Sequence, residues 1–206
     1  MHIGIIPDGN RRWLVKNKSN NIIDQWIGMV NSAVGEYMTH SEEYNDMLSK
    51  VSELTIYITS SDNVKKRCGS KSIKDVYSGV HIFCDKFLNM QFISRVFNFN
   101  FVGDLGALPP EVICDLDKIK NACVGNITIN VAINYDYTHA EYKNSPPPID
   151  IVYRSGGEKR LSGFFPIQTA YAELLFDDAL WPDVKLLKVI KKCVTTLELA
   201  NRNFGA

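Results

Sequence analysis

The strongest constraint on the fold of this chain is an alternation between short apolar runs and longer segments with helical periodicity. Five runs have strand length, contain many β-branched or aromatic residues, and end in polar or glycine-bearing positions. They are HIGIIP, ELTIYIT, RVFNFNFVG, NITINVAIN and IDIVYRS, which begin at residues 2, 53, 95, 126 and 149. This alternation predicts an α/β fold with a mainly parallel central sheet of about six strands, which we expect helices to flank on both faces.

Two segments show the helical pattern most clearly. Between the second and third runs, residues 75–88 carry apolar side chains at helical spacing, namely Val76, Tyr77, Val80, Phe83, Cys84 and Phe87. A terminal helix is predicted to open at Pro182-Asp183. Its apolar face would consist of Leu186, Leu187, Ile190, Val194 and Leu197, while its lysines face water.

Length and charge limit the classes of function. At 206 residues and 45% hydrophobic composition, the chain is long enough to bury a core as a single domain over residues 1–206. Lys plus Arg and Asp plus Glu are equal at 23 each, so no global charge favours a nucleic-acid partner, and any electrostatic function is local. The start lacks a signal-peptide pattern and no run approaches the roughly 20 apolar residues of a membrane span, which predicts a cytoplasmic protein. Five cysteines without CxxC spacing predict neither a zinc ribbon nor a disulfide framework.

The first polar cluster is GIIPDGNRRW, where an apolar run ends in Asp8-Gly9-Asn10 and is followed by Arg11 and Arg12. Backbone N–H groups and guanidinium groups at such a point can bind a phosphate. Asp8 would repel that anion unless a cation lay between them, and Mg²⁺ binds one or two carboxylates together with substrate phosphates. The alternative is that Asp8 caps a helix and the arginines are solvated.

A second polar cluster extends from Tyr153. Arg154 ends a strand, two glycines follow it, and Arg160 and Ser162 add a second cation and a hydroxyl group. Alone, such a loop is a common surface turn. Because ligands of parallel sheets collect beyond the carboxyl ends of the strands, the two clusters together predict a site for two adjacent anionic groups.

The motifs, taken together and in order, resemble those of the cis-prenyltransferases, the family of undecaprenyl diphosphate synthase and dehydrodolichyl diphosphate synthase. The motifs are DGNRRW, LTIYITSSDN, VGDLGALP, NVAINY, YRSGGEKRLSGF, AYAELLF with LWPD, and NRNFG. The resemblance covers nearly the whole chain. It implies the family's fold and a Mg²⁺-dependent enzyme that condenses isopentenyl diphosphate with an allylic diphosphate such as farnesyl diphosphate. It also implies a homodimer or a heterodimer. Because the product is oily, the resemblance is compatible with transient contact with a membrane surface.

The resemblance also assigns roles near the allylic substrate. It implies that Asp8 is the carboxylate linked to Mg²⁺ at the allylic diphosphate. The loop that grips this diphosphate would consist of Gly9, Asn10, Arg11 and Arg12. Ser60 and Asn63 match polar residues beside the reacting carbons, and Asn63 would help to position the substrate for proton loss.

The remaining matched residues imply a second subsite and a product class. Arg154, Arg160 and Ser162 resemble the isopentenyl diphosphate site, and Glu173 resembles a carboxylate that helps to complete metal binding there. Ile58 occupies a position where the family often has a small residue. We therefore interpret it as a feature that shortens the product.

Several positions depart from the family pattern. Gln25 replaces a histidine, and an expected arginine is Asn21. After Tyr135 the family reads Gly-Gly-Arg and continues through a helix, whereas here Asp136-Tyr137-Thr138 leads to a proline-rich linker, so a family segment is missing. Val64 stands where the family has a tryptophan, and three cationic residues follow it at 65–67. Gly163 stands where the family has an asparagine after Ser162.

These departures leave alternatives open. One alternative is a non-catalytic partner subunit that supports an active synthase through its tail, residues 202–205. Another is a phosphate-binding regulator. Retention of Asp8, Arg12, Arg154, Arg160 and Glu173 together favours the enzyme, because a scaffold needs none of them.

Overall fold

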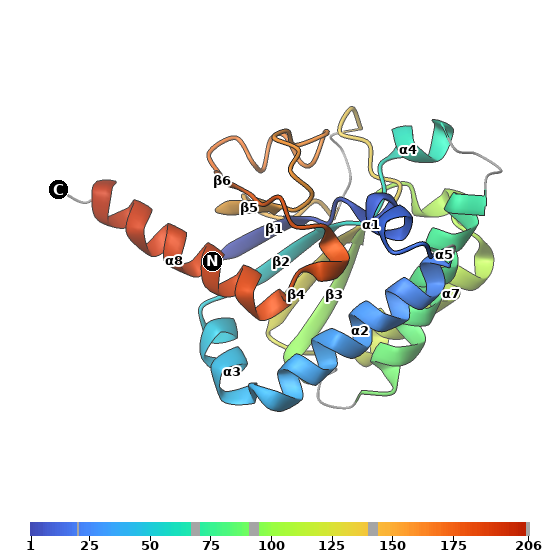
Figure 1. Cartoon of the computed structure of the whole chain (residues 1–206), viewed down its shortest axis with the longest axis horizontal. Helices are drawn as coiled ribbons and strands as arrows, with labels where there is room; N and C mark the ends of the chain where they lie inside the picture. Colours follow the sequence, from blue (N-terminus) through green and yellow to red (C-terminus); the bar gives the residue numbers. More distant parts are fainter. Residues whose placement is uncertain (20, 67–70, 91–94, 140–143, 205–206) are drawn as a thin grey trace.

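The computed structural model describes residues 1–19, 21–66, 71–90, 95–139 and 144–204, without the side chains of 71–72 and 201–204. Its centre is one sheet of six strands in the order β3-β4-β2-β1-β5-β6, and all five pairings are parallel (Figure 1). The strands are β1 (His2–Ile6), β2 (Glu53–Tyr57), β3 (Phe97–Val102), β4 (Ile127–Ala132), β5 (Ile151–Arg154) and β6 (Glu173–Phe176). The predicted fold class and the five predicted strands are confirmed. The sixth strand lies in the AYAELLF motif, which the residue pattern had not marked as a strand.

The helices connect these strands in the expected way. They are α1 (Asn10–Lys16), α2 (Ile22–Thr39), α3 (Ser41–Ser49), α4 (Ser61–Lys66), α5 (Lys71–Leu88), α7 (Pro110–Ala122) and α8 (Leu186–Phe204), with 3-10 turns η1 (Leu105–Ala107) and η2 (Trp181–Asp183). The start predicted for the terminal helix is wrong. Pro182-Asp183 belongs to η2, which ends at an extended Val184 before α8 begins. No helix in the described ranges is long and apolar enough to cross a membrane.

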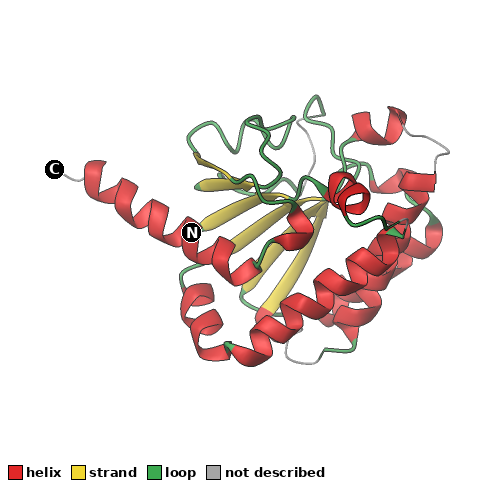
Figure 2. Cartoon of the chain, viewed as in Figure 1, coloured by secondary structure: helices red, strands yellow, loops and turns green. Residues whose placement is uncertain are grey.

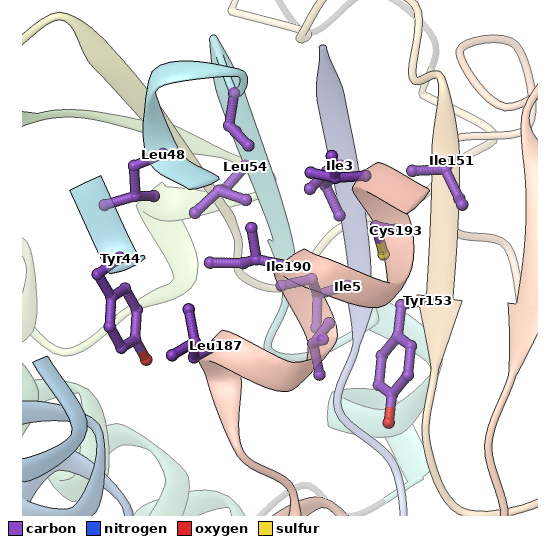
Figure 3. Close-up of a cluster of buried hydrophobic side chains, with 13 residues drawn as sticks. Ile3, Ile5, Tyr44, Leu48, Leu54, Ile151, Tyr153, Leu187, Ile190 and Cys193 are labelled. Carbon is purple, nitrogen blue, oxygen red and sulfur yellow. The ribbon is translucent and has the colours of Figure 1, made fainter. Parts of the chain in front are cut away.

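One face of the sheet, which we call the helix face, is covered by helices (Figure 2). Ile3 and Ile5 of β1 pack there with Tyr153 of β5 against α3 and α8, as Figure 3 shows. On the neighbouring strands β3 and β4, aromatic and branched residues pack against α5 and α7. The predicted apolar face of the terminal helix is confirmed, because Leu187, Ile190 and Val194 are buried in this core.

The opposite face, which we call the loop face, differs from the prediction. Its core cluster includes Ile6 of β1 and Val152 of β5, together with Phe164 and Phe165 from the loop between β5 and β6. None of the residues of this cluster lies in a helix. The expectation of helices on both faces is therefore wrong for the described residues. Part of the loop face is polar, since Asn100 of β3 donates to Asn130 of β4 at 2.7 Å and Asn130 donates to Glu53 of β2 at 2.7 Å.

Strand alternation explains this division between the faces. Successive side chains of a strand point to opposite faces, so in FNFNFV the phenylalanines and the asparagines separate. Phe99 and Phe101 are buried on the helix face, whereas Asn98 is exposed. Similarly, Tyr153 points into the helix-face core and Arg154 points to the loop face.

Candidate active site

The two predicted polar clusters converge at the carboxyl ends of β1 and β5. These strands are neighbours, with Ile6 in register with Arg154. Asp8 Oδ2 accepts a hydrogen bond from Arg154 Nη2 at 2.7 Å, and the Arg154 side chain is only 4% exposed. The prediction that two turns far apart in the chain meet in one place is confirmed.

Two hydrogen bonds stabilise the ionised form of Asp8. Burial alone would raise its pKa, but the hydrogen bond from Arg154 and the one from the Gly9 N–H, at 2.6 Å, lower the pKa below its usual value. Asp8 is therefore ionised near neutral pH. It holds the buried guanidinium group in place, rather than acting only as the helix cap of the alternative interpretation, and no side chain caps α1.

The arginines of the first cluster lie in the first turn of α1, as predicted. Gly9 precedes the helix with a φ of +99°. Arg12 Nη2 lies 3.7 Å from Asp8 Oδ1, and it also approaches the second cluster, because a Cβ built on Gly156 would lie 2.7 Å from it. Gly156, with a φ of +85°, thus leaves the space that Arg12 occupies. Arg11 is exposed on the same turn.

Asn10, which is predicted to grip the allylic diphosphate, makes contacts within the chain. Its Nδ2 donates to the carbonyl of Pro7 at 2.9 Å, and its Oδ1 accepts from Gln25 Nε2 at 3.2 Å. Gln25 is buried, and its Oε1 has no partner within the described residues. The residue at the family's histidine position therefore links α2 to the start of α1.

Ser162 and Arg160 lie beside Arg154 on the loop face. Arg154 Nη1 donates to Ser162 Oγ at 2.9 Å and also to the carbonyl of Arg160. The guanidinium group of Arg160 is exposed and pairs with Glu158. The structure therefore brings Ser162 to the pair of Asp8 and Arg154, while the side chain of Arg160 faces solvent at the rim.

Ser60 and Asn63 follow β2, on the other side of β1 at the same edge of the sheet. Ser60 pairs with Tyr135 in an isolated bridge, and its Oγ accepts from the backbone N–H of Asn63 at 3.1 Å. Ser60 thus stabilises the first turn of α4, and the side chain of Asn63 is exposed. Their positions agree with a site at the carboxyl edge.

Glu173, predicted as a metal ligand, lies at the amino ends of the strands, away from the carboxyl ends where Asp8 and Arg154 meet. It is in register with Ile151 at the start of β5, whereas Arg154 is in register with Phe176 at the end of β6. The three steps along the strand correspond to about 10 Å. Within the described residues, Glu173 is therefore not brought to the contact of Asp8 with Arg154, and its role as a metal ligand stays a prediction.

Sequence reasoning missed the residues that fix the first turn. Ser155 is fully buried, and its Oγ lies 2.9 Å from both the backbone nitrogen and the carbonyl oxygen of Asp8. The Trp181 N–H donates to the Asp8 carbonyl at 3.0 Å, and Trp13 Nε1 donates to Asp183 Oδ1 at 2.7 Å. The LWPD motif carries Trp181 and Asp183, but the sequence interpretation used it for the resemblance and for the start of the terminal helix, not for contacts with the Asp8 turn.

The site fits a metal ion that takes most of its ligands from a substrate. The described residues contain no group of three or more His, Cys, Asp or Glu side chains that could hold an ion. Asp8 provides a single ionised carboxylate, partly exposed at 33%. This donor set suits Mg²⁺ bound through one carboxylate, phosphates and water, and it does not suit an ion held in an all-protein cage.

The sequence profile described as "Putative undecaprenyl diphosphate synthase" matches residues 6–141 and 137–205, which together span nearly the whole chain. The chain belongs to the cis-prenyltransferase family. An isoprenyl transferase 2 from Tropheryma whipplei is 27% identical over an alignment covering 100% of this chain and 88% of that protein. A geranylgeranyl-diphosphate-specific tritrans,polycis-undecaprenyl-diphosphate synthase from Aeropyrum pernix is 31% identical, covering 88% of this chain and 87% of its own length.

The fold of this cis-prenyltransferase is also found in solved structures. Lavandulyl diphosphate synthase from Lavandula x intermedia, crystallised with dimethylallyl diphosphate, superposes with a TM-score of 0.73 at 17% identity, over 95% of this chain and 94% of that chain. The family match breaks near residues 137–141, and the Tropheryma alignment spans 240 positions although this chain has 206 residues. Both observations agree with a missing family segment after Tyr135.

An apolar cavity of about 270 Å³ opens beside this edge of the cis-prenyltransferase, on the helix face. Pro7 and Asn10, the neighbours of the Asp8 turn, contribute to its wall. The other walls come from strand residues, from η2 and from several helices, among them α2 and α5 with Trp26, Val80 and Phe87. Ile58, which the sequence interpretation took as a feature that shortens the product, also lines the cavity.

Other departures from the family have local structural roles. The side chain of Asn21 accepts from the N–H of Ile23 at 3.0 Å and so caps α2. Lys65 lies 3.6 Å from Asp136, and Lys66 lies 3.8 Å from Asp62. Arg67 and the side chains of the tail at 202–205 lie outside the described residues.

Proposed function

We propose that this chain condenses isopentenyl diphosphate with an allylic diphosphate, such as farnesyl diphosphate, to form a cis-prenyl diphosphate. The observation that carries this proposal is the 2.7 Å contact of Asp8 with Arg154 at the carboxyl edge, directly beside an apolar cavity. Charged groups suit two diphosphates, and the cavity suits a hydrocarbon chain.

The allylic diphosphate would lie against the first turn of α1. Arg11 and Arg12 are exposed there, and both remain cationic at physiological pH. When the allylic C–O bond breaks, negative charge develops on the leaving diphosphate and positive charge on the carbon. Guanidinium groups aimed at the leaving group therefore stabilise the transition state more than the ground state.

Isopentenyl diphosphate would bind on the loop side of the same edge. Ser162 and Arg154 already form a hydrogen-bonded pair there, and Arg160 lies at the rim. A diphosphate held at this subsite fixes the new nucleophilic carbon relative to the allylic carbon. Asn63, exposed beyond β2, would orient the substrate as a carbon–carbon bond forms and a proton leaves.

Mg²⁺ is the metal that this site would bind, through Asp8 and the substrate phosphates. When bound, it neutralises charge on the leaving diphosphate. The hydrogen bonds from Arg154 and Gly9 keep Asp8 ionised and oriented for that contact.

The hydrocarbon chain would extend into the cavity on the helix face. Its volume of about 270 Å³ is below the range of roughly 300–1,000 Å³ for typical ligand pockets. We therefore propose a short-chain product, whose length the side chain of Ile58 limits.

A homodimer would form along β6. This strand lies at an edge of the sheet, and exposed edge strands with apolar side chains are sites of association. Ile167, Tyr171 and Leu174 are 71%, 101% and 47% exposed around it. A dimer built there would also bring the exposed Glu173 of each copy to the interface.

The test is to incubate the purified chain with radiolabelled isopentenyl diphosphate, farnesyl diphosphate and Mg²⁺. Butanol-extractable product from the chain alone supports the proposal. Product that appears only after a second, different subunit is added supports the non-catalytic partner. Substrate binding without turnover under either condition supports the phosphate-binding regulator.

A further inference from the structure

Two departures from the family pattern, Tyr137 and Gly163, touch each other on the loop face. A Cβ built on Gly163 would lie 2.7 Å from Tyr137 Cδ1 and 3.3 Å from Tyr137 Cε1. A contact below 3.0 Å cannot be accommodated without movement, so the ring of Tyr137 occupies the space that any side chain at position 163 would need. The ring and the glycine are thus a matched pair.

Gly163 belongs to a strained turn that carries the second subsite. Ser162 has a φ of +53° and Gly163 a φ of +78°, so two consecutive residues adopt the left-handed conformation. Ser162 is not a glycine, and it holds this conformation only if its surroundings impose it. Ser162 Oγ is also the group that accepts from Arg154 at 2.9 Å.

Two tyrosines from different parts of the chain contact this turn. The Tyr57 hydroxyl donates to the carbonyl of Ser162 at 3.3 Å, from the last position of β2. The ring of Tyr137 lies against Gly163, the residue after Ser162. Tyr137 is 56% exposed, so one part of the ring faces solvent. The turn is therefore held by a hydroxyl on one side and by ring carbons on the other.

The position of Tyr137 is itself fixed by its neighbours. Asp136 Oδ1 accepts from the backbone N–H of Thr138 at 3.0 Å and from its hydroxyl at 2.7 Å. Asp136 Oδ2 accepts from Ser61 Oγ at 2.8 Å, at the start of α4. The backbone of the short Asp136-Tyr137-Thr138 turn is thus anchored to the sheet edge, which places the ring of Tyr137 against Gly163.

We propose that Tyr137 is a positioning residue whose ring holds the Arg160–Gly163 turn in the conformation that binds the diphosphate of isopentenyl diphosphate. This inference rests on the proposed function for the identity of the ligand. The contact uses ring carbons, so the hydroxyl of Tyr137 is not required.

The experiment measures the dissociation constant of isopentenyl diphosphate by titration calorimetry, which needs no turnover, and then the kinetics of condensation. Tyr137→Ala should raise the dissociation constant and the KM for isopentenyl diphosphate about tenfold, the size expected when a strained turn relaxes. The kcat and the KM for the allylic diphosphate should stay within about twofold of wild type, because only binding at one subsite has changed. Tyr137→Phe should retain wild-type affinity, and the distant, exposed Met38→Ala serves as the matched control.

Coupling between the two positions gives a second measurement. Gly163→Ala should weaken binding by pushing the ring away. In the double variant with Tyr137→Ala the loss should be smaller than the product of the two single losses, because the collision no longer exists.

Unchanged affinity in Tyr137→Ala, or an equal loss in Tyr137→Phe, overturns the inference. So does an equal rise in the KM of both substrates. Wild-type binding of isopentenyl diphosphate without turnover would overturn the proposed function but leave the role of Tyr137 open to the same titration. Absence of binding by the wild type would overturn both.

Discussion

The helix face and the loop face of the sheet use the same strands for opposite purposes. On the helix face, α2 and α5 enclose an apolar cavity beside the strand ends. On the loop face, the chain between β5 and β6 packs Phe164 and Phe165 against β1 and presents Ser162 to Arg154. One face can hold a hydrocarbon, and the other can hold charge.

This difference follows from the period of a strand. Because successive side chains alternate, β5 places Tyr153 in the apolar core and Arg154 in the polar site one residue later. The two environments meet where β1 ends, at Pro7 and Asp8. A reaction that breaks the bond between a diphosphate leaving group and an apolar chain, and forms a carbon–carbon bond in its place, suits that boundary.

The largest expected effect comes from removing the contact of Asp8 with Arg154, where the two environments meet. Asp8→Ala leaves the Arg154 guanidinium, only 4% exposed, without its counter-charge. We expect the free energy of unfolding to fall by about 3–5 kcal/mol, and turnover to fall at least about 100-fold. Urea denaturation and the radiolabel assay measure the two effects.

A surface carboxylate provides the control for that variant. Glu198 is half exposed and pairs with Lys50 at 3.1 Å. Glu198→Ala should cost at most about 1 kcal/mol. Equal stabilities of the two variants would show that the contact of Asp8 with Arg154 does not hold the edge together.

The next prediction asks whether the loop face is packed as firmly as the helix face. Phe99, on the helix face, is 1% exposed, and Phe164, on the loop face, is 0% exposed. Phe99→Ala and Phe164→Ala should each lower the free energy of unfolding by about 3–5 kcal/mol. Chemical denaturation measures both, and a cost for Phe164→Ala that is much smaller than that for Phe99→Ala would contradict a true core beneath the loops.

A third prediction concerns a variant that should change the product and leave the diphosphate subsites unaffected. Ile58→Ala enlarges the cavity on the helix face. Products should become longer, while the KM for isopentenyl diphosphate stays within about twofold, since no diphosphate contact is lost. Chromatography of the products measures chain length.

Ile113→Ala is the matched control for that variant. Ile113 packs against the same core but does not line the cavity. It should keep the wild-type product. An unchanged product from Ile58→Ala would remove this side chain from length control.

The smallest effect concerns a buried histidine on the loop face. His2 is 3% exposed, and its ring nitrogens lie 2.6 Å from Thr55 Oγ1 and 3.0 Å from the Pro148 carbonyl. Burial lowers the pKa of His2 below 6.5, its usual value. As pH falls through 6.5, His2 therefore binds a proton in the unfolded chain but not in the folded chain. Stability should therefore fall below pH 6.5, by up to about 1.4 kcal/mol per pH unit from this group.

Denaturation at several pH values between about 5 and 7, the range in which histidine titrates, tests this predicted fall in stability. His2→Gln should show a shallower decline, whereas the exposed His40→Gln should decline as the wild type does. An identical decline in His2→Gln would show that other groups are responsible.

Much of the fold followed from the sequence because strand period and strand length are local signals. Five strands, the parallel sheet and the helix at 75–88 were predictable for this reason. β6 was not, because its residues, including Glu173 and Leu174, are exposed at an edge and lack a buried pattern. The covering of the loop face by loops instead of helices was also not predictable, since it depends on which segments pack on the sheet and not on the strands alone.

The site was predictable where charge was the signal. Asp8 and Arg154 stand at strand ends, and a parallel sheet brings such ends together. Register decided the case of Glu173, because its motif says nothing about which end of β6 it occupies. The buried role of Ser155 and the contact of Tyr137 with Gly163 depend on backbone conformation, which residue types alone do not specify.

The most direct test of the account is a crystal structure with an unreactive allylic thiodiphosphate, isopentenyl diphosphate and Mg²⁺. The account predicts the hydrocarbon in the helix-face cavity beside Ile58, and the two diphosphates at the carboxyl edge on either side of Asp8. A hydrocarbon chain bound on the loop face, or diphosphates bound away from Asp8 and Arg154, would contradict it.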